Sequence, residues 1–128
     1  MPRGAVCDDR WVRPTVLIVD DHEAFRVAAR SLLEAEGFTV VGEAAEGAEA
    51  LEQAERLAPD VLLLDIQLPG IDGFAVAERL AARGEPPAVV LISSREAASY
   101  GPRLAHAAAR GFIPKRALSG DALAALVA

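Results

Sequence analysis

Five short apolar runs alternate along this chain with segments whose apolar residues recur at helical spacing. From these runs we predict strands at residues 15–19, 39–43, 61–64, 88–92 and 111–114. The intervening periodicity predicts helices at residues 23–36, 48–57, 74–82 and 120–127, and a short helix that begins at Pro102 after a long loop. Strands and helices that alternate in this way form a parallel α/β sheet.

The apolar spacing also predicts which residues face the core. In helix 23–36 the inward residues are Phe25, Ala28, Ala29, Leu32 and Leu33, and in helix 48–57 they are Ala50, Leu51, Ala54 and Leu57. The strand 61–64 is apolar at every position, which is typical of a central strand covered on both faces. Asp72 occupies the expected N-cap position of helix 74–82.

Length and composition restrict the class of protein. A chain of 128 residues suffices for one domain with a core, and we assign residues 1–13 to an N-terminal extension and 14–128 to that domain. No apolar run approaches the roughly 20 residues that cross a bilayer. The lone Cys7 cannot form an internal disulfide, so we expect a cytoplasmic protein. The net charge of -6 argues against direct binding to nucleic acid.

Polar residues stand at the ends of four of the predicted strands. Asp20 and Asp21 follow the first strand, Asp65 the third, Ser93 the fourth and Lys115 the fifth. The carboxyl ends of parallel strands share one edge of a sheet, so we expect these five side chains in a single crevice.

Together these residues could carry out phosphoryl transfer. Asp20, Asp21 and Asp65 offer the hard oxygen ligands that Mg²⁺ prefers. Lys115 and Ser93 can neutralise the oxygens of a transferring phosphoryl group, and Asp65, at the centre, is the natural acceptor.

Four motifs give the chain a family resemblance. They are Val19-Asp20-Asp21, the run from Leu64-Asp65 through Pro69-Gly70 to Asp72-Gly73, Ile92-Ser93-Ser94, and Gly111-Phe112-Ile113-Pro114-Lys115. With these motifs, in this order, the chain resembles the receiver domain of two-component response regulators from about Pro14 to Ala128. The resemblance implies a flavodoxin-like (βα)5 fold with strand order 2-1-3-4-5.

The resemblance also implies a role for each motif residue. Asp65 would accept a phosphoryl group from a sensor histidine kinase or phosphotransfer protein, and Ser93 and Lys115 would hold its oxygens. The Mg²⁺ ligands would be Asp20, Asp21, Asp65 and the main-chain carbonyl of Gln67. Phe112 would change rotamer as Ser93 moves toward the phosphoryl group. The change would reach a downstream protein through the short helix, the last strand and the last helix, a surface that is also compatible with a homodimer.

One position departs from the common pattern. Receiver domains usually have proline directly after the lysine, whereas here Arg116 follows Lys115 and Pro114 precedes it. This variant occurs in regulators of the helix-turn-helix DNA-binding class, which the chain resembles most. The sequence ends at Ala128 without an output domain, so we expect either a stand-alone receiver, which we favour, or a fragment of a longer regulator.

Other interpretations compete with this one. A receiver-like module could be regulated by a ligand or by protein contact without phosphorylation, and a metal-dependent phosphatase could act through an aspartyl intermediate. Taken singly, Asp21 could cap the first helix, and His22 and His106 are expected on the surface. Because of the resemblance to receiver domains, we expect a signalling switch rather than an enzyme that acts on a separate substrate.

Overall fold

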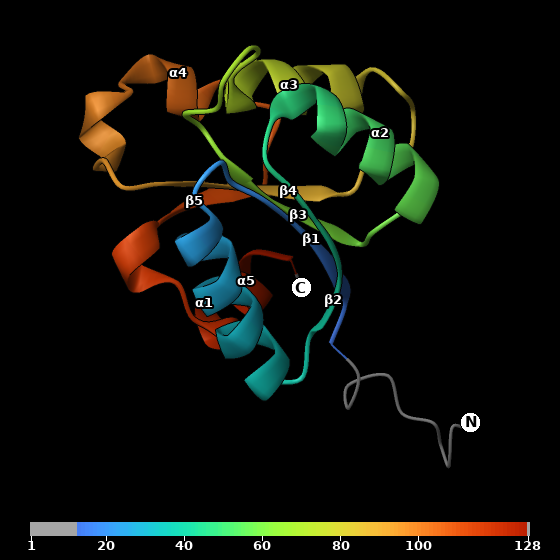
Figure 1. The fold of residues 1–128 in the computed structure, drawn as a ribbon. Coiled ribbons are helices and arrows are strands. Elements are labelled where there is room, and N and C mark those ends of the chain that lie inside the picture. Colours follow the sequence, from blue (N-terminus) through green and yellow to red (C-terminus); the bar gives the residue numbers. More distant parts are fainter. Residues whose placement is uncertain (1–12, 128) are drawn as a thin grey trace.

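The computed structural model describes residues 13–127, which form a central parallel sheet between two layers of helices (Figure 1). Neighbouring strands pair in the order β2-β1-β3-β4-β5, the flavodoxin-like order predicted from the sequence. The strands are β1 (Thr15–Val19), β2 (Thr39–Ala44), β3 (Val61–Asp65), β4 (Ala88–Ser93) and β5 (Gly111–Pro114).

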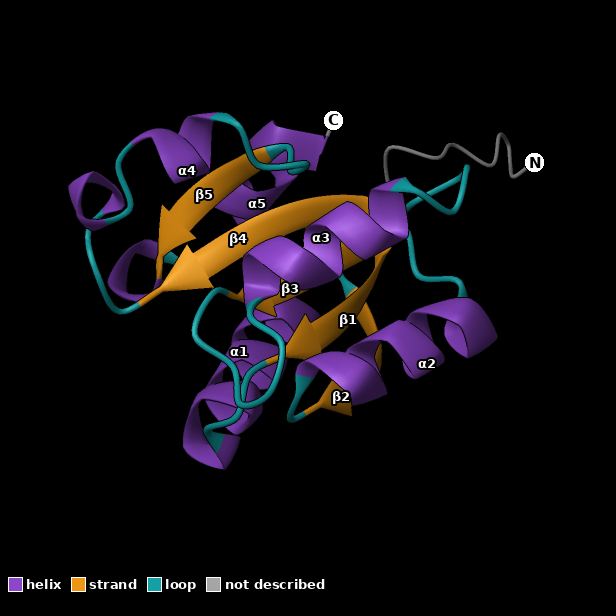
Figure 2. Cartoon of the chain, turned by 90° about the horizontal axis from the view of Figure 1, so that it is seen from above, coloured by secondary structure: helices purple, strands orange, loops and turns teal. Residues whose placement is uncertain are grey.

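The helices divide between the two faces of the sheet. Figures 1 and 2 show α2, α3 and α4 over one face and α1 and α5 over the other. Their bounds are α1 (Glu23–Ala35), α2 (Gly47–Leu57), α3 (Gly73–Ala81), α4 (Pro102–Ala105) and α5 (Gly120–Val127). Short 3-10 helices, η2 (Ala97–Ser99) and η3 (Lys115–Ala117), precede α4 and follow β5.

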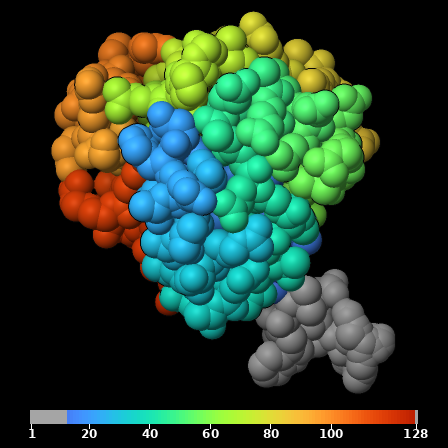
Figure 3. All heavy atoms as spheres, in the orientation of Figure 1, coloured from blue at the N-terminus to red at the C-terminus, as the bar shows by residue number. Residues whose placement is uncertain are grey.

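Alternating side chains of the central strands divide the core into two clusters. In β3, Leu62 and Leu64 pack toward α2 and α3, whereas Val61 and Leu63 pack toward α1 and α5. All four residues are at most 1% exposed, which confirms β3 as a central strand covered on both faces. The space-filling view, in the orientation of Figure 1, shows the side chains of α1 and α2 at the front of the molecule, where the two helices flank the sheet from opposite faces (Figure 3).

The predicted element boundaries are correct to within one residue. Strands β2, β3 and β4 each extend one residue further than predicted, so that Asp65 and Ser93 are the last residues of their strands. One predicted core residue is wrong. Ala28 is exposed, because α1 turns mainly Ala29 and Leu33 into the core, with Phe25 and Leu32 half-buried.

The start of α3 fixes the loop that follows β3. The Asp72 side chain accepts a hydrogen bond from the Ala75 amide at 2.9 Å, so the predicted N-cap is confirmed. A Cβ at Gly73 would lie 2.5 Å from the Asp65 carbonyl oxygen, so only glycine allows the helix to begin this close to the strand end.

Residues 1–12 lie outside the described part of the chain, and only Arg13 of the predicted extension can be placed. Its guanidinium donates to the Gly120 carbonyl at 3.0 Å and lies 5.1 Å from the centre of the Phe38 ring. Arg13 therefore packs against the domain between the loop that follows α1 and the first residue of α5.

Candidate functional site

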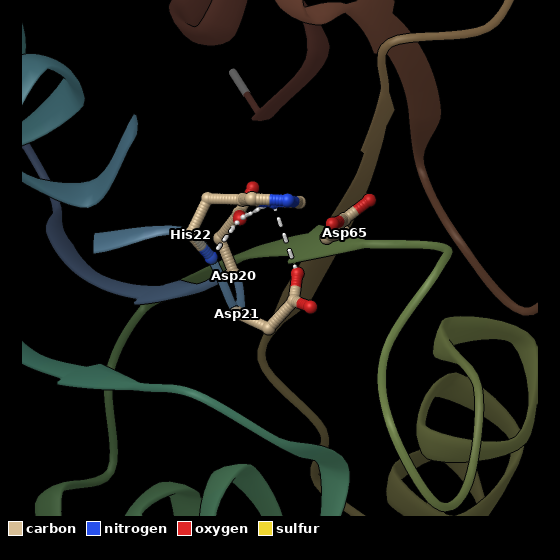
Figure 4. A group of neighbouring side chains, drawn as sticks. All are labelled: Asp20, Asp21, His22 and Asp65. Carbon is tan, nitrogen blue, oxygen red and sulfur yellow. Dashed lines mark hydrogen bonds and ion pairs between the residues drawn. The ribbon is translucent and has the colours of Figure 1, made fainter. Parts of the chain in front are cut away.

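The sheet brings the three predicted acids and the predicted lysine to one edge. Asp20 directly follows β1, Asp65 ends β3, and Lys115 directly follows β5. Figure 4 shows Asp20, Asp21 and Asp65 converging above the strand ends, with His22 beside them. The sequence-based expectation of a shared crevice at the carboxyl ends is therefore confirmed for these residues.

Lys115 is the cation at the centre of this cluster. Its ammonium nitrogen lies 2.6 Å from Asp20 Oδ2 and 3.3 Å from Asp65 Oδ2. The side chains of both acids are almost fully buried, at 0% and 3% exposure. The positive charge of Lys115 therefore offsets the repulsion between the two buried carboxylates, which would otherwise disfavour their ionised forms.

The Asp65 carboxyl group releases its proton at a higher pH than an ordinary aspartate does. Burial, followed by repulsion from Asp20, raises its pKa from 3.8 to about 6. The charge of Lys115 and a hydrogen bond from the Gln67 amide to Asp65 Oδ1, at 3.2 Å, act in the opposite direction. A bound divalent cation would favour the ionised carboxylate in the same way.

The ammonium group remains charged despite its burial. Desolvation alone lowers the pKa of Lys115, but its contacts with Asp20 and Asp65 outweigh that effect and raise the pKa above its usual value. The ammonium also lies 4.7 Å from the centre of the Phe25 ring, so an aromatic face of α1 borders the site.

Asp21 and His22 form the more exposed side of the cluster. His22 Nδ1 lies 3.1 Å from Asp21 Oδ1 and 3.2 Å from Asp20 Oδ1. The N-cap residue of α1 is His22, so the alternative in which Asp21 caps this helix is wrong. The His22 side chain is 70% exposed, as expected for a surface histidine, yet it contacts the acidic cluster.

The donor set fits a small divalent cation. Asp20, Asp21, His22 and Asp65 can each direct one ligand atom so that all lie within 4.8 Å of one another. Lys115 approaches Asp20 Oδ2 outside hydrogen-bonding geometry, so this buried oxygen has a charge partner but no hydrogen-bond donor within residues 13–127. Three carboxylates with free acceptor capacity are the ligand chemistry of Mg²⁺.

Ser93 lies at the end of β4, as predicted, and is fully buried. Its hydroxyl oxygen accepts a hydrogen bond from the Arg95 amide at 3.0 Å and lies 2.6 Å from the Tyr100 hydroxyl. Phe112, the predicted switch residue, is half-buried in β5, and its ring lies edge-on to Tyr100 with centroids 6.3 Å apart. Tyr100 therefore contacts both predicted residues, Ser93 through its hydroxyl and Phe112 through its ring.

A family model describes much the same part of the chain. The model for the response regulator receiver domain matches residues 16–127. The chain belongs to the response regulator receiver domain family. A phosphorylation-regulated signalling switch is consistent with this membership, which indicates a signalling rather than a catalytic role.

Individual receivers and regulators resemble the chain closely. The DNA-binding transcriptional activator EvgA of Escherichia coli K12 is 32% identical over 112 residues, which are 88% of this chain and 55% of EvgA. A Pseudomonas aeruginosa protein described as a "Putative transcriptional regulator" is 48% identical over 101 residues, or 79% of this chain and 49% of that protein. The receiver thus spans about half the length of these relatives.

Solved receiver structures share the fold. The signal receiver domain of NarL from Mycobacterium tuberculosis matches with a TM-score of 0.80 and 32% identity, covering 90% of this chain and 97% of that one. The response regulator domain of Thermotoga maritima CheB matches with a TM-score of 0.76 and 27% identity, covering 88% and 92% of the two chains. No helix within residues 13–127 of the receiver is both long and apolar enough to span a membrane.

Three neighbours of the receiver site were not predicted from the sequence. Tyr100, His22 and Phe25 contact Ser93, the acids and Lys115 respectively. His22 had a signal, because it directly follows the acidic pair, but an exposed histidine is usually uninvolved. Tyr100 and Phe25 had none, because their contacts depend on the path of a loop and the rotation of a helix.

Proposed function

We propose that the chain is a phosphorylation-activated switch whose acceptor is Asp65. The observation that carries this proposal is the position of the Lys115 ammonium, 2.6 Å from Asp20 and 3.3 Å from Asp65. A fixed cation beside one buried carboxylate of a three-acid cluster is suited to hold an oxygen of a phosphoryl group during transfer.

In this proposal a carboxylate oxygen of Asp65 attacks the phosphorus atom of the donor. The bond between phosphorus and the donor atom breaks as the new bond to oxygen forms. Lys115 and the Ser93 hydroxyl then bind oxygens of the transferred group. The pKa of about 6 leaves most Asp65 side chains ionised and nucleophilic near neutral pH.

Asp20, Asp21, Asp65 and the main-chain carbonyl of Gln67 are the proposed Mg²⁺ ligands. When bound, Mg²⁺ would supply positive charge for the phosphoryl oxygens and leave exchangeable coordination positions for them. Asp21 is 35% exposed, so an ion could reach the cluster from this side. The Gln67 amide donates a hydrogen bond to Asp65, which places Gln67 next to the site.

The upstream partner would be a sensor histidine kinase or a phosphotransfer protein in the cytoplasm. The downstream partner would recognise the surface formed by α4, β5 and α5 after Ser93 and Phe112 rearrange. Several relatives are named as transcriptional regulators, so control of transcription through another domain or protein is part of the proposal. A homodimer through the same surface remains a prediction, as does the receiver boundary at residues 14–128.

Intact-mass spectrometry after incubation with Mg²⁺ and acetyl phosphate would test this function. We expect one labile phosphoryl adduct that is absent from Asp65→Asn and from a sample treated with a chelator. If the wild-type chain forms no adduct and does not bind beryllofluoride with Mg²⁺, regulation by a ligand or by protein contact becomes the better explanation.

A further inference from the structure

The Ser93 hydroxyl has only one proton to donate, and its surroundings indicate where that proton points. The oxygen already accepts a hydrogen bond from the Arg95 amide at 3.0 Å. Because Ser93 is fully buried, its proton cannot be donated to bulk water. Tyr100 is the remaining hydrogen-bonding partner of this hydroxyl within residues 13–127, at 2.6 Å.

Tyr100 is half-buried, whereas Ser93 is fully buried, so of the two residues the tyrosine is the one with access to solvent. Its phenolic oxygen can accept a hydrogen bond while its proton is donated elsewhere. The arrangement that satisfies both hydroxyls has Ser93 donating to Tyr100. A reversed bond would leave the buried serine proton without an acceptor, which costs free energy.

We propose that Tyr100 is a positioning residue that competes with the phosphoryl group for the Ser93 proton. The inference rests on the proposed function, in which Ser93 donates to an oxygen of the group bound to Asp65. That donation requires the proton now directed at Tyr100. Phosphorylation therefore exchanges the Ser93–Tyr100 hydrogen bond for a Ser93–phosphoryl hydrogen bond.

The Tyr100 ring connects this exchange to other elements of the fold. Its centroid lies 5.8 Å from that of Phe74 in α3 and 6.3 Å from that of Phe112 in β5, both in edge-on geometry. The guanidinium of Arg103 in α4 lies 4.3 Å from the centre of the Phe74 ring. Release of Tyr100 would free the segment from η2 to α4 to move against α3 and β5.

Tyr100→Phe is the most direct test, because it removes the hydroxyl and keeps the ring. The substitution removes the Ser93–Tyr100 hydrogen bond from the unphosphorylated state. In the phosphorylated state that bond is already absent from the wild type, so the substitution removes nothing there. We therefore expect Mg²⁺-saturated Tyr100→Phe to bind beryllofluoride about three- to tenfold more tightly than the wild type. Isothermal titration calorimetry would measure the two affinities.

A double-mutant cycle separates positioning from a change in packing. In a Ser93→Ala background there is no serine proton to compete for, so Tyr100→Phe should leave the affinity for beryllofluoride unchanged. Ser94→Ala, which alters the exposed neighbouring serine, is the matched control and should bind like the wild type. An equal effect of Tyr100→Phe in both backgrounds would show that the hydroxyl does not act through Ser93.

The chain contains a single tyrosine, which permits a direct spectroscopic readout. With tyrosine labelled at ¹³Cζ, one resonance reports the hydrogen bonding of the Tyr100 oxygen. We expect Mg²⁺ and beryllofluoride to shift it in the same direction as Ser93→Ala shifts it in the free protein. If the wild type binds beryllofluoride but this resonance does not move, or Tyr100→Phe fails to tighten binding, the competition is wrong while the proposed function stands. No binding to the wild type contradicts the proposed function itself.

Discussion

The Lys115 ammonium lies closer to Asp20 than to Asp65, at 2.6 Å against 3.3 Å. The lysine that should meet the phosphoryl group therefore forms its shorter ion pair with Asp20 and donates its hydrogen bond to Asp65, the proposed acceptor. A cation that takes over the charge of Asp20 would weaken that ion pair and leave Lys115 freer to turn toward Asp65. Metal binding and lysine position are coupled in this arrangement.

Replacing Lys115 by methionine tests its role in offsetting the buried charges. Without the ammonium, Asp20 and Asp65 repel each other in a buried setting, so we expect the metal-free protein to lose about 2–4 kcal/mol of stability. Urea denaturation with and without Mg²⁺ would measure this, and Mg²⁺ should stabilise Lys115→Met more than the wild type. Arg116→Met, which alters the neighbouring exposed cation, is the control and should keep the wild-type denaturation midpoint. Equal midpoints for all three proteins would contradict the role assigned to Lys115.

The raised pKa of Asp65 makes stability depend on pH in a defined direction. Between pH 4 and about 6 the unfolded chain has released the Asp65 proton and the folded protein has not, so the metal-free protein loses stability as the pH rises. We expect Asp65→Asn to remove this loss and to be more stable than the wild type at pH 7 by about 1–3 kcal/mol. The difference should vanish near pH 4.

Urea denaturation of the metal-free proteins across pH 4–7 would measure this dependence. Asp121→Asn changes a carboxylate that is 93% exposed and should follow the wild-type curve. A wild-type protein whose stability rises, relative to Asp65→Asn, between pH 4 and 6 would show that the site favours the ionised carboxylate even without metal.

Asp21→Asn separates metal binding from folding. The Asp21 side chain is 35% exposed, and its one ion-pair partner within residues 13–127 is the exposed imidazole of His22, so its replacement should change stability little. Loss of one charged oxygen ligand should weaken Mg²⁺ binding at least about tenfold, as measured by calorimetry. Glu23→Gln alters a nearby exposed acid in the first turn of α1 and should bind Mg²⁺ like the wild type. Similar affinities for both variants would exclude Asp21 as a ligand.

The N-cap of α3 contributes to stability without contacting the acids. Asp72→Ala removes the acceptor of the Ala75 amide and should lower the free energy of unfolding by about 1 kcal/mol. Asp72→Ser keeps a capping oxygen and should recover most of that loss in the same thermal or urea denaturation. If the two variants are equally unstable, the ion pair of Asp72 with Arg103, and not the cap, is the important contact.

The sequence predicted those parts of the molecule that depend on local patterns. Strand β3 is apolar throughout and is flanked by turn residues, so its position and burial could be read from residues 61–64. The meeting of Asp20, Asp65 and Lys115 followed from one topological rule about parallel strands. Ala28 was misplaced because apolar spacing marks a broad helix face, whereas packing against the sheet selects a narrower one.

Contacts that depend on loop conformation could not be predicted. Tyr100 reaches Ser93 only because the chain after β4 turns through η2 before α4 begins. No periodicity exists in such a segment, and a lone tyrosine carries no spacing signal. For this reason the hydrogen bond between Ser93 and Tyr100 could not be predicted from sequence patterns.

Lys115, the lysine of the cluster, directly follows the edge strand β5. This position affects the order in which the molecule can fold. Asp20 and Asp65 enter the sheet on β1 and β3, long before β5 is synthesised. A nascent chain therefore carries its acids uncompensated until its last strand docks, and contacts between such distant segments form slowly. Divalent cations present during synthesis would substitute for the missing ammonium, so magnesium should speed the refolding of chains in which β5 has not yet joined the sheet.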